Sequence, residues 1–127
     1  MGNWSFKAFV NKSGHGFQVW YDELPIKAKA KFDRRLVYLQ IQSIEAWKPP
    51  LVRKLKGYNK IFEHRVDFNK ELFRPLGFFG SKGQEFIFLI GAKEQGDILI
   101  PRDAPEIAKS RMELVIRDRS YINDLIY

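Results

Sequence analysis

The chain contains no cysteine and only two histidines, His15 and His64, among its 127 residues. The absence of cysteine excludes disulfides, thiolate zinc sites and a cysteine nucleophile. Two histidines cannot form a histidine-rich metal centre by themselves, and we expect no metal and no other cofactor. The longest apolar run, residues 86–92, is too short to cross a bilayer, and the first residues lack the apolar stretch of a signal peptide. These absences predict a cytoplasmic protein with no membrane partner.

What is present fits one folded domain covering residues 1–127. Hydrophobic residues make up 45% of the chain and aromatic residues 15%, which excludes a disordered polycation. A chain of this length can bury roughly two thirds of its unfolded surface, enough for a single core.

Positive charge is concentrated in one segment. Residues 27–60 contain ten lysines and arginines but only two acidic residues, so they carry +8, whereas the whole chain carries +7. A local field of this kind attracts polyanions. It is equally typical of a solvated helix face followed by a basic loop, and it does not distinguish RNA, DNA and an acidic protein.

Apolar periodicity predicts the first elements. Residues 4–10 alternate as a strand does, and residues 17–24 place their apolar side chains on one side of a short helix. Residues 26–46 have the apolar stripe of a long amphipathic helix. Pro49 and Pro50 end that helix, because proline cannot continue it.

The second half reads as strands followed by a helix. Strands are predicted over 61–68, 71–79 and 85–91, with Pro75 marking an edge or a bulge in the second. Residues 96–105 read as a loop. Residues 104–118 read as a helix, and the aromatic tail 121–127 is expected to pack against the body.

Strands joined by short turns pair antiparallel. The predicted fold class is therefore α+β, with a small antiparallel sheet, two N-terminal helices packed on one face and a C-terminal helix. The long second helix is expected to cover one sheet face and leave the other open to solvent or a ligand.

Five segments, in this order, resemble the RelE/ParE toxin superfamily, and most closely its phage-derived HigB-like branch. They are RKLKG at 53–57, IFEHR at 61–65, FRPLGFF at 73–79, FLIGAK at 88–93 and PEIAKSR at 105–111. The resemblance extends over about residues 17–117. It implies the RelE-like fold and a toxin of a type II toxin–antitoxin pair.

Many members of this superfamily are metal-independent endoribonucleases that cut mRNA on the ribosome, whereas ParE-type members poison DNA gyrase. The resemblance further implies an antitoxin partner, expected here to be a helix-turn-helix protein. The chain departs from the family pattern at His64, Pro75, Gly77, Ala92 and Glu94.

Cutting RNA without a metal requires a base for the 2′-hydroxyl, stabilisation of the phosphorane charge and a proton for the leaving 5′-oxygen. Five cations are candidates, because strand alternation could bring them together on the open sheet face. These catalytic candidates are Lys54, Lys56, Arg65, Arg74 and Lys93. We expect Arg65 and Arg74 to stabilise charge, Lys54 or Lys56 to transfer a proton, and Lys93 to hold a flanking phosphate. Lys29, Arg53 and Lys60 are candidates for further RNA binding.

Each candidate also has a structural interpretation. Arg65 could pair with Glu63 or Asp67 on its own strand, where surface ion pairs contribute little. Arg74 could bind an antitoxin carboxylate, and Lys54 and Lys56 could be ordinary solvated residues. His64 reads as a core histidine with one satisfied ring nitrogen, and Glu63 as a weak alternative base.

Tyr121 and Tyr127 could stack on a base, although packing is the simpler role for both.

Three functions therefore remain open at this point: an RNA-cleaving toxin, a ParE-like or other inhibitor that binds a protein, and an RNA-binding module without catalysis. The lysines and arginines of the motifs favour the first. The altered positions Pro75, Gly77 and Ala92 favour the other two.

Overall fold

The computed structural model describes residues 2–127 and contains two sheets and three α-helices. The helices are α1 (Phe17–Asp22), α2 (Ile26–Gln40) and α3 (Ala104–Arg117), with short 3₁₀ turns at Ile44–Ala46 and Arg119–Tyr121. The strands are β1 (Ser5–Phe9), β2 (Val52–Lys54), β3 (Phe62–His64), β4 (Val66–Phe68), β5 (Glu71–Phe73), β6 (Leu76–Phe79), β7 (Glu85–Ile90), β8 (Lys93–Gln95), β9 (Ile98–Ile100) and β10 (Ile122–Asp124). The predicted α+β class is confirmed.

The larger sheet has six strands in the order β10-β1-β7-β6-β3-β2, and the smaller has four in the order β4-β5-β8-β9. All neighbouring strands are antiparallel except β1 and β7, which are parallel. The tail packs as expected, because β10 pairs with β1 and Leu125 is buried.

Two predicted strands are divided between the two sheets, and the third, β7, is followed by a strand of the smaller sheet. The predicted strand 61–68 breaks at Arg65 into β3 and β4, and 71–79 breaks at Arg74–Pro75 into β5 and β6. The backbone after β7 likewise breaks at Gly91–Ala92 before β8. Backbone hydrogen bonds join neighbouring break points, with Arg74 N donating to Ala92 O at 2.8 Å. The three breaks therefore lie side by side, and the two sheets meet along this line, which we call the crease.

Two other boundaries differ from the sequence prediction. The helix predicted over 26–46 ends at Gln40, and a separate 3₁₀ turn follows, because Ser43 has extended backbone angles (φ −71°, ψ 168°) that no helix can contain. The predicted loop 96–105 contains β9, which pairs with β8 around a tight turn at Gly96–Asp97.

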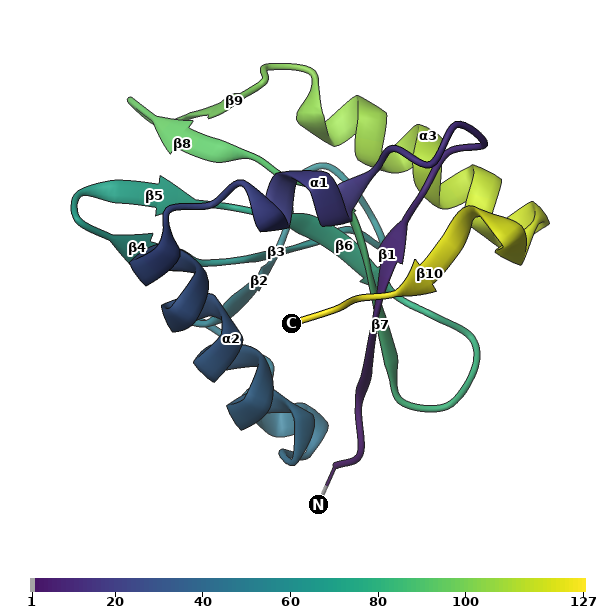
Figure 1. Cartoon of the computed structure of the whole chain (residues 1–127), viewed down its shortest axis with the longest axis horizontal. Helices are drawn as coiled ribbons and strands as arrows, with labels where there is room; N and C mark the ends of the chain where they lie inside the picture. Colours follow the sequence, from purple (N-terminus) through teal and green to yellow (C-terminus); the bar gives the residue numbers. More distant parts are fainter. Residues whose placement is uncertain (1) are drawn as a thin grey trace.

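Both faces of the larger sheet are covered. Along β7, Phe86 and Phe88 join the core beneath α1 and α2, whereas Ile87 and Leu89 join a second core beneath α3. Figure 1 shows α2 and α3 on opposite sides of the strands. The expectation of an open sheet face is therefore wrong, because α3 occupies it.

Within residues 2–127, no helix is both long enough and apolar enough to cross a membrane.

Candidate functional site

A polar hollow of about 270 Å³ lies between the edge strand β2 and the β8–β9 hairpin, where the two sheets meet. We call it the β2–hairpin cleft. Its lining consists of Arg53, Lys54, Leu55, Lys56, Glu63, Arg65, Glu94, Asp97, Ile98 and Leu99. Four cations and three carboxylates therefore meet in one hollow.

Strand pairing determines which of these side chains share a face. Arg53 lies directly opposite Glu63 in the β2–β3 pair, so both side chains project to the same face of the sheet. Arg65 follows β3 and its Nη1 donates to Glu63 Oε1 at 2.7 Å. Arg65 therefore forms an ion pair with Glu63, and Arg53 projects from the neighbouring strand on the same face.

The two lysines lie at the rim of the cleft. Lys54 is opposite Phe62 in the pairing, which directs its side chain to the other face from Arg53. Lys54 and Lys56 are both exposed, whereas Leu55 between them is half-buried against the second core. The expected alternation around Leu55 is present.

Arg74 does not reach the cleft as a free cation. Its side chain is only 1% exposed, with Nη1 donating to Asp67 Oδ1 at 2.7 Å and Nε donating to Glu94 Oε1 at 3.0 Å. Nη1 also donates to the Phe73 carbonyl oxygen at 2.8 Å. Arg74 instead binds Glu94, and the side chain of Glu94 lines the cleft.

Lys93 also lies outside the lining. Its ammonium forms an ion pair with Glu71 and lies 5.4 Å from the centre of the Phe73 ring. The expectation that five cations meet on one open face is therefore corrected. Lys54, Lys56 and Arg65 share the cleft, whereas Arg74 and Lys93 are bound to acidic residues of the smaller sheet.

The three further RNA-binding candidates are separated. Arg53 belongs to the cleft. Lys29 lies on α2, where its Nζ is 3.3 Å from Asp33 Oδ2 and 4.6 Å from the centre of the Tyr21 ring. Lys60 lines a different hollow, beside β6 and α3.

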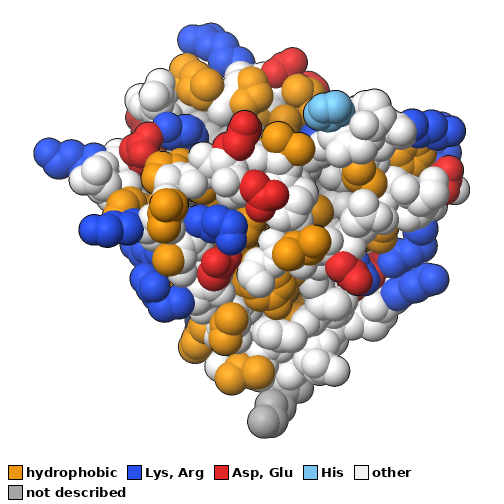
Figure 2. Space-filling view, viewed as in Figure 1, with side chains coloured by type: hydrophobic (Ala, Val, Ile, Leu, Met, Phe, Trp, Pro, Cys, Tyr) orange, Lys and Arg blue, Asp and Glu red, His pale blue; other side chains and the backbone are white. Residues whose placement is uncertain are grey.

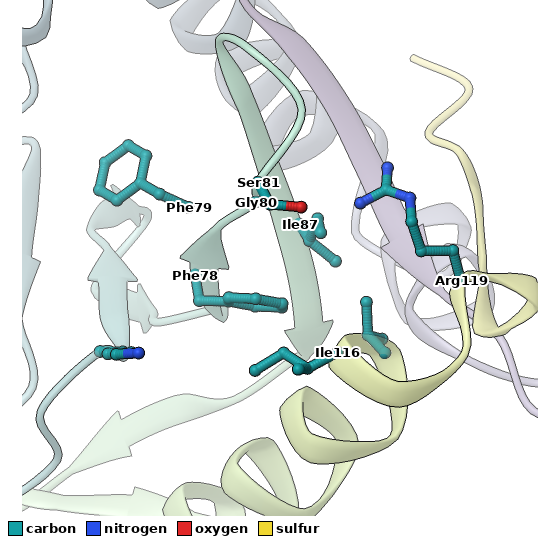
Figure 3. A pocket seen from close by; sticks show the side chains of 9 residues that line it. Phe78, Phe79, Gly80, Ser81, Ile87, Ile116 and Arg119 are labelled. Carbon is teal, nitrogen blue, oxygen red and sulfur yellow. The ribbon is translucent and has the colours of Figure 1, made fainter.

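That second hollow is mainly apolar and has a volume of about 230 Å³. Figure 3 shows Phe78, Ile87 and Ile116 directed into it, with Arg119 at its edge. Arg119 donates to both carboxylate oxygens of buried Glu85 at 2.9 Å, so it is engaged within the protein. This hollow offers no cluster of unpaired cations.

The hairpin wall of the cleft was missed by the sequence analysis. Asp97 and Leu99 line the cleft, although the sequence pattern predicts a loop over residues 96–105. The consecutive apolar residues Ile98, Leu99 and Ile100 were the available signal, because β-branched runs favour strands.

The histidines do not contribute to the cleft. His64 is buried among aromatic rings, as expected of a core histidine, but the expected hydrogen bond to one ring nitrogen is absent, because neither nitrogen has a partner among residues 2–127. His15 is exposed in the turn after β1, with Nδ1 3.2 Å from Ser13 Oγ. Among residues 2–127 no three histidine or acidic side chains gather in a way that could hold a metal ion.

The tyrosines of the tail make packing contacts. Tyr121 stacks on Phe9 with ring centres 6.0 Å apart, and Tyr127 meets Phe6 edge-on at 5.7 Å. Packing therefore accounts for both residues.

Comparison with known proteins defines the family. The model of the phage-derived Gp49-like proteins (DUF891) matches residues 19–113, well over half of the chain. The chain belongs to this family. No curated protein and no solved structure matches significantly. The expected relationship to phage-derived proteins is confirmed at this level, and the closer relationship to RelE, ParE and HigB toxins stays a prediction.

Proposed function

We propose that the chain is the toxin of a type II toxin–antitoxin pair and cleaves mRNA on the ribosome without a metal. The observation that carries the proposal is the β2–hairpin cleft, where Arg65 pairs with Glu63, Arg53 lies opposite Glu63 in the strand pair, and Lys54 and Lys56 lie at the rim. The family match and the sequence resemblance to HigB-like toxins support it.

The cleft supplies groups for two requirements of RNA cleavage. The guanidinium groups of Arg53 and Arg65 can bind the phosphate and stabilise the negative charge that develops on its oxygens. Lys54 or Lys56, each with three donors on a flexible stem, can deliver a proton to the leaving 5′-oxygen. Arg74 and Lys93 have no part in this scheme, because neither side chain lines the cleft.

The experiment is primer extension on cellular mRNA after brief induction. The wild-type chain should produce discrete, codon-linked cuts, and Arg65→Ala should reduce them by about 100-fold or more, the scale of a lost transition-state donor. Arg34→Ala is the matched control, because Arg34 is an exposed arginine on α2 outside the cleft lining. Equal cutting by Arg65→Ala and wild type would refute the assignment.

A second candidate is a non-nucleolytic inhibitor, either ParE-like or acting by binding alone. Three carboxylates, Glu63, Glu94 and Asp97, reduce the net charge of the cleft and favour this alternative. DNA damage without mRNA cuts after induction would support gyrase poisoning. Growth arrest with neither DNA damage nor mRNA cuts would support an inhibitor that acts by binding alone.

The proposed partner is an antitoxin of the helix-turn-helix type with an acidic or amphipathic segment. Exposed apolar side chains at the end of α2 and just after it support a protein partner there; they are Val37, Tyr38, Ile41 and Ile44. Figure 2 shows lysine and arginine side chains mostly near the outline of this face, with acidic and hydrophobic ones between them. A small neighbouring reading frame that encodes a helix-turn-helix protein would support this proposal, provided that the encoded protein co-purifies with the chain.

A further inference from the structure

Glu63 is an unusual residue for the floor of a basic cleft. Its side chain is only 9% exposed, yet it lines the hollow beside Arg53 and Arg65. Burying a carboxylate costs free energy unless it is paired. Glu63 is paired with Arg65 through one oxygen, Oε1. A carboxylate accepts hydrogen bonds at both oxygens, so Oε2 remains available to a substrate.

The other two carboxylates of the cleft are placed differently. Glu94 lies on the opposite wall, where the buried guanidinium of Arg74 binds it. Asp97 is exposed in the turn of the β8–β9 hairpin. Of the three, only Glu63 pairs with an arginine that itself lines the cleft and lies across the strand pair from a second one.

A phosphate bound by Arg65 would place the attached ribose near Glu63, because Arg65 Nη1 donates to Glu63 Oε1 and Arg53 lies opposite Glu63 in the strand pair. The remaining requirement of the proposed reaction is a base for the 2′-hydroxyl. We infer that Glu63 is this general base, a role that rests on the proposed RNA cleavage.

The reaction balances with groups of the chain alone. Glu63 takes the proton of the 2′-hydroxyl, and the 2′-oxygen attacks the neighbouring phosphorus. The bond between phosphorus and the 5′-oxygen breaks, and Lys54 or Lys56 protonates the departing oxygen. The products are a 2′,3′-cyclic phosphate and a 5′-hydroxyl end, and the proton later passes from Glu63 to the lysine through solvent.

The test uses the purified full chain and a single-stranded RNA that the wild-type chain cleaves. Glu63→Gln preserves an oxygen that Arg65 can bind but removes the basic group. We expect cleavage to fall by about 100-fold or more, while binding of the same RNA with a 2′-deoxy sugar at the cut stays within about threefold. Glu113→Gln, the same loss of charge at an exposed residue of α3 outside the cleft lining, should leave cleavage within about threefold.

The pH profile separates a base from a positioning residue. Wild-type cleavage should fall tenfold per pH unit at low pH, as the base becomes protonated, and Glu63→Gln should lose this dependence. If Glu63→Gln does not fold, as judged by thermal unfolding, Glu63→Asp provides the test. It retains a carboxylate that is one methylene shorter, and it should cleave at least tenfold more slowly with the low-pH dependence intact.

The outcomes distinguish the two proposals. Wild-type cleavage by Glu63→Gln, or an equal loss of RNA binding and cleavage, would overturn the role of Glu63 alone. If the wild-type chain cuts no RNA, with or without ribosomes, the proposed function falls and the role of Glu63 falls with it.

Discussion

At the scale of single residues, His64 is a polar side chain fully buried among aromatic rings. Its ring lies 4.7 Å from Phe86, 4.9 Å from Phe88 and 5.4 Å from Trp47, measured between ring centres. Burial and, to a smaller extent, the positive charge of Arg35 together lower its pKa from 6.5 to about 3. The folded protein therefore keeps His64 neutral, with both nitrogens unsatisfied.

This pKa makes stability depend on pH in a definite direction. Between pH 6.5 and about 3 the unfolded chain binds a proton at His64 that the folded chain does not, so acid favours unfolding. From pH 7 to 4.5 we expect wild type to lose roughly 2–3 kcal/mol more unfolding free energy than His64→Leu. Urea unfolding at both pH values measures this difference, and parallel losses in the two proteins would contradict it.

Arg74 is placed by the structure as a bridge within the smaller sheet. Its guanidinium connects Asp67 on β4 to Glu94 on β8. We expect Arg74→Ala to lower the unfolding free energy by about 3–5 kcal/mol, because buried side-chain contacts are lost and two carboxylates lose their partner.

Urea unfolding tests the role of Arg74. An Arg74→Ala protein with wild-type stability but no RNA cleavage would restore the catalytic role that the sequence suggested.

At the scale of elements, α2 shows how a helix can be anchored on one side and free on the other. Leu36 is completely buried in the first core, whereas its neighbour Val37 is 56% exposed. Leu36→Ala should cost about 2–5 kcal/mol of unfolding free energy. Val37→Ala, the matched change one position along the helix, should alter it by less than about 0.5 kcal/mol.

Chemical denaturation of both variants measures the difference. Similar costs at the two positions would mean that the outer face of α2 is covered in solution.

The elements also show what the sequence could and could not predict. The three α-helices follow from apolar periodicity and proline positions, and all three are present near their predicted ranges. The division of 61–68 into β3 and β4 did not follow, because side-chain alternation runs through Arg65 without interruption. Only the change of pairing partner, from β6 to β5, marks the crease there, and pairing is a long-range property.

The sequence predicted some residues of the candidate site and misplaced others. Lys54, Lys56 and Arg65 meet in the cleft because they lie on neighbouring segments of one strand pair. Arg74 looked equivalent in sequence, but its binding partners come from β4 and β8, which fold against it from distant parts of the chain. Local pattern does not distinguish a buried arginine from an exposed one.

At the scale of the whole molecule, the positive charge of residues 27–60 is not a single surface. On α2, the ammonium of Lys31 donates to the carbonyl oxygen of Asp67, and Arg35 Nη1 donates to that of Arg65 at 2.8 Å. These cations hold α2 against β4 and the crease. The cations of the β2–hairpin cleft remain as the cluster best placed for a polyanion.

Salt dependence of RNA binding measures how many cations contact phosphates. If all four cations of the cleft do, the logarithm of the association constant should fall by about 3 per logarithmic unit of salt. Lys54→Ala should reduce that slope by about 0.7, whereas Lys109→Ala, an exposed lysine on α3, should leave it unchanged. Fluorescence anisotropy over a range of salt concentrations provides both slopes, and equal slopes for Lys54→Ala and wild type would exclude a phosphate contact at Lys54.

The central claim is that RNA binds in the cleft between β2 and the β8–β9 hairpin. The most direct measurement is backbone amide NMR of the chain with a single-stranded oligonucleotide that carries 2′-deoxy sugars and so cannot be cut. We expect the largest shift changes at residues 52–56, 62–65 and 94–99, with little change along α2. Changes confined to α2 or to the apolar hollow beside α3 would contradict the claim.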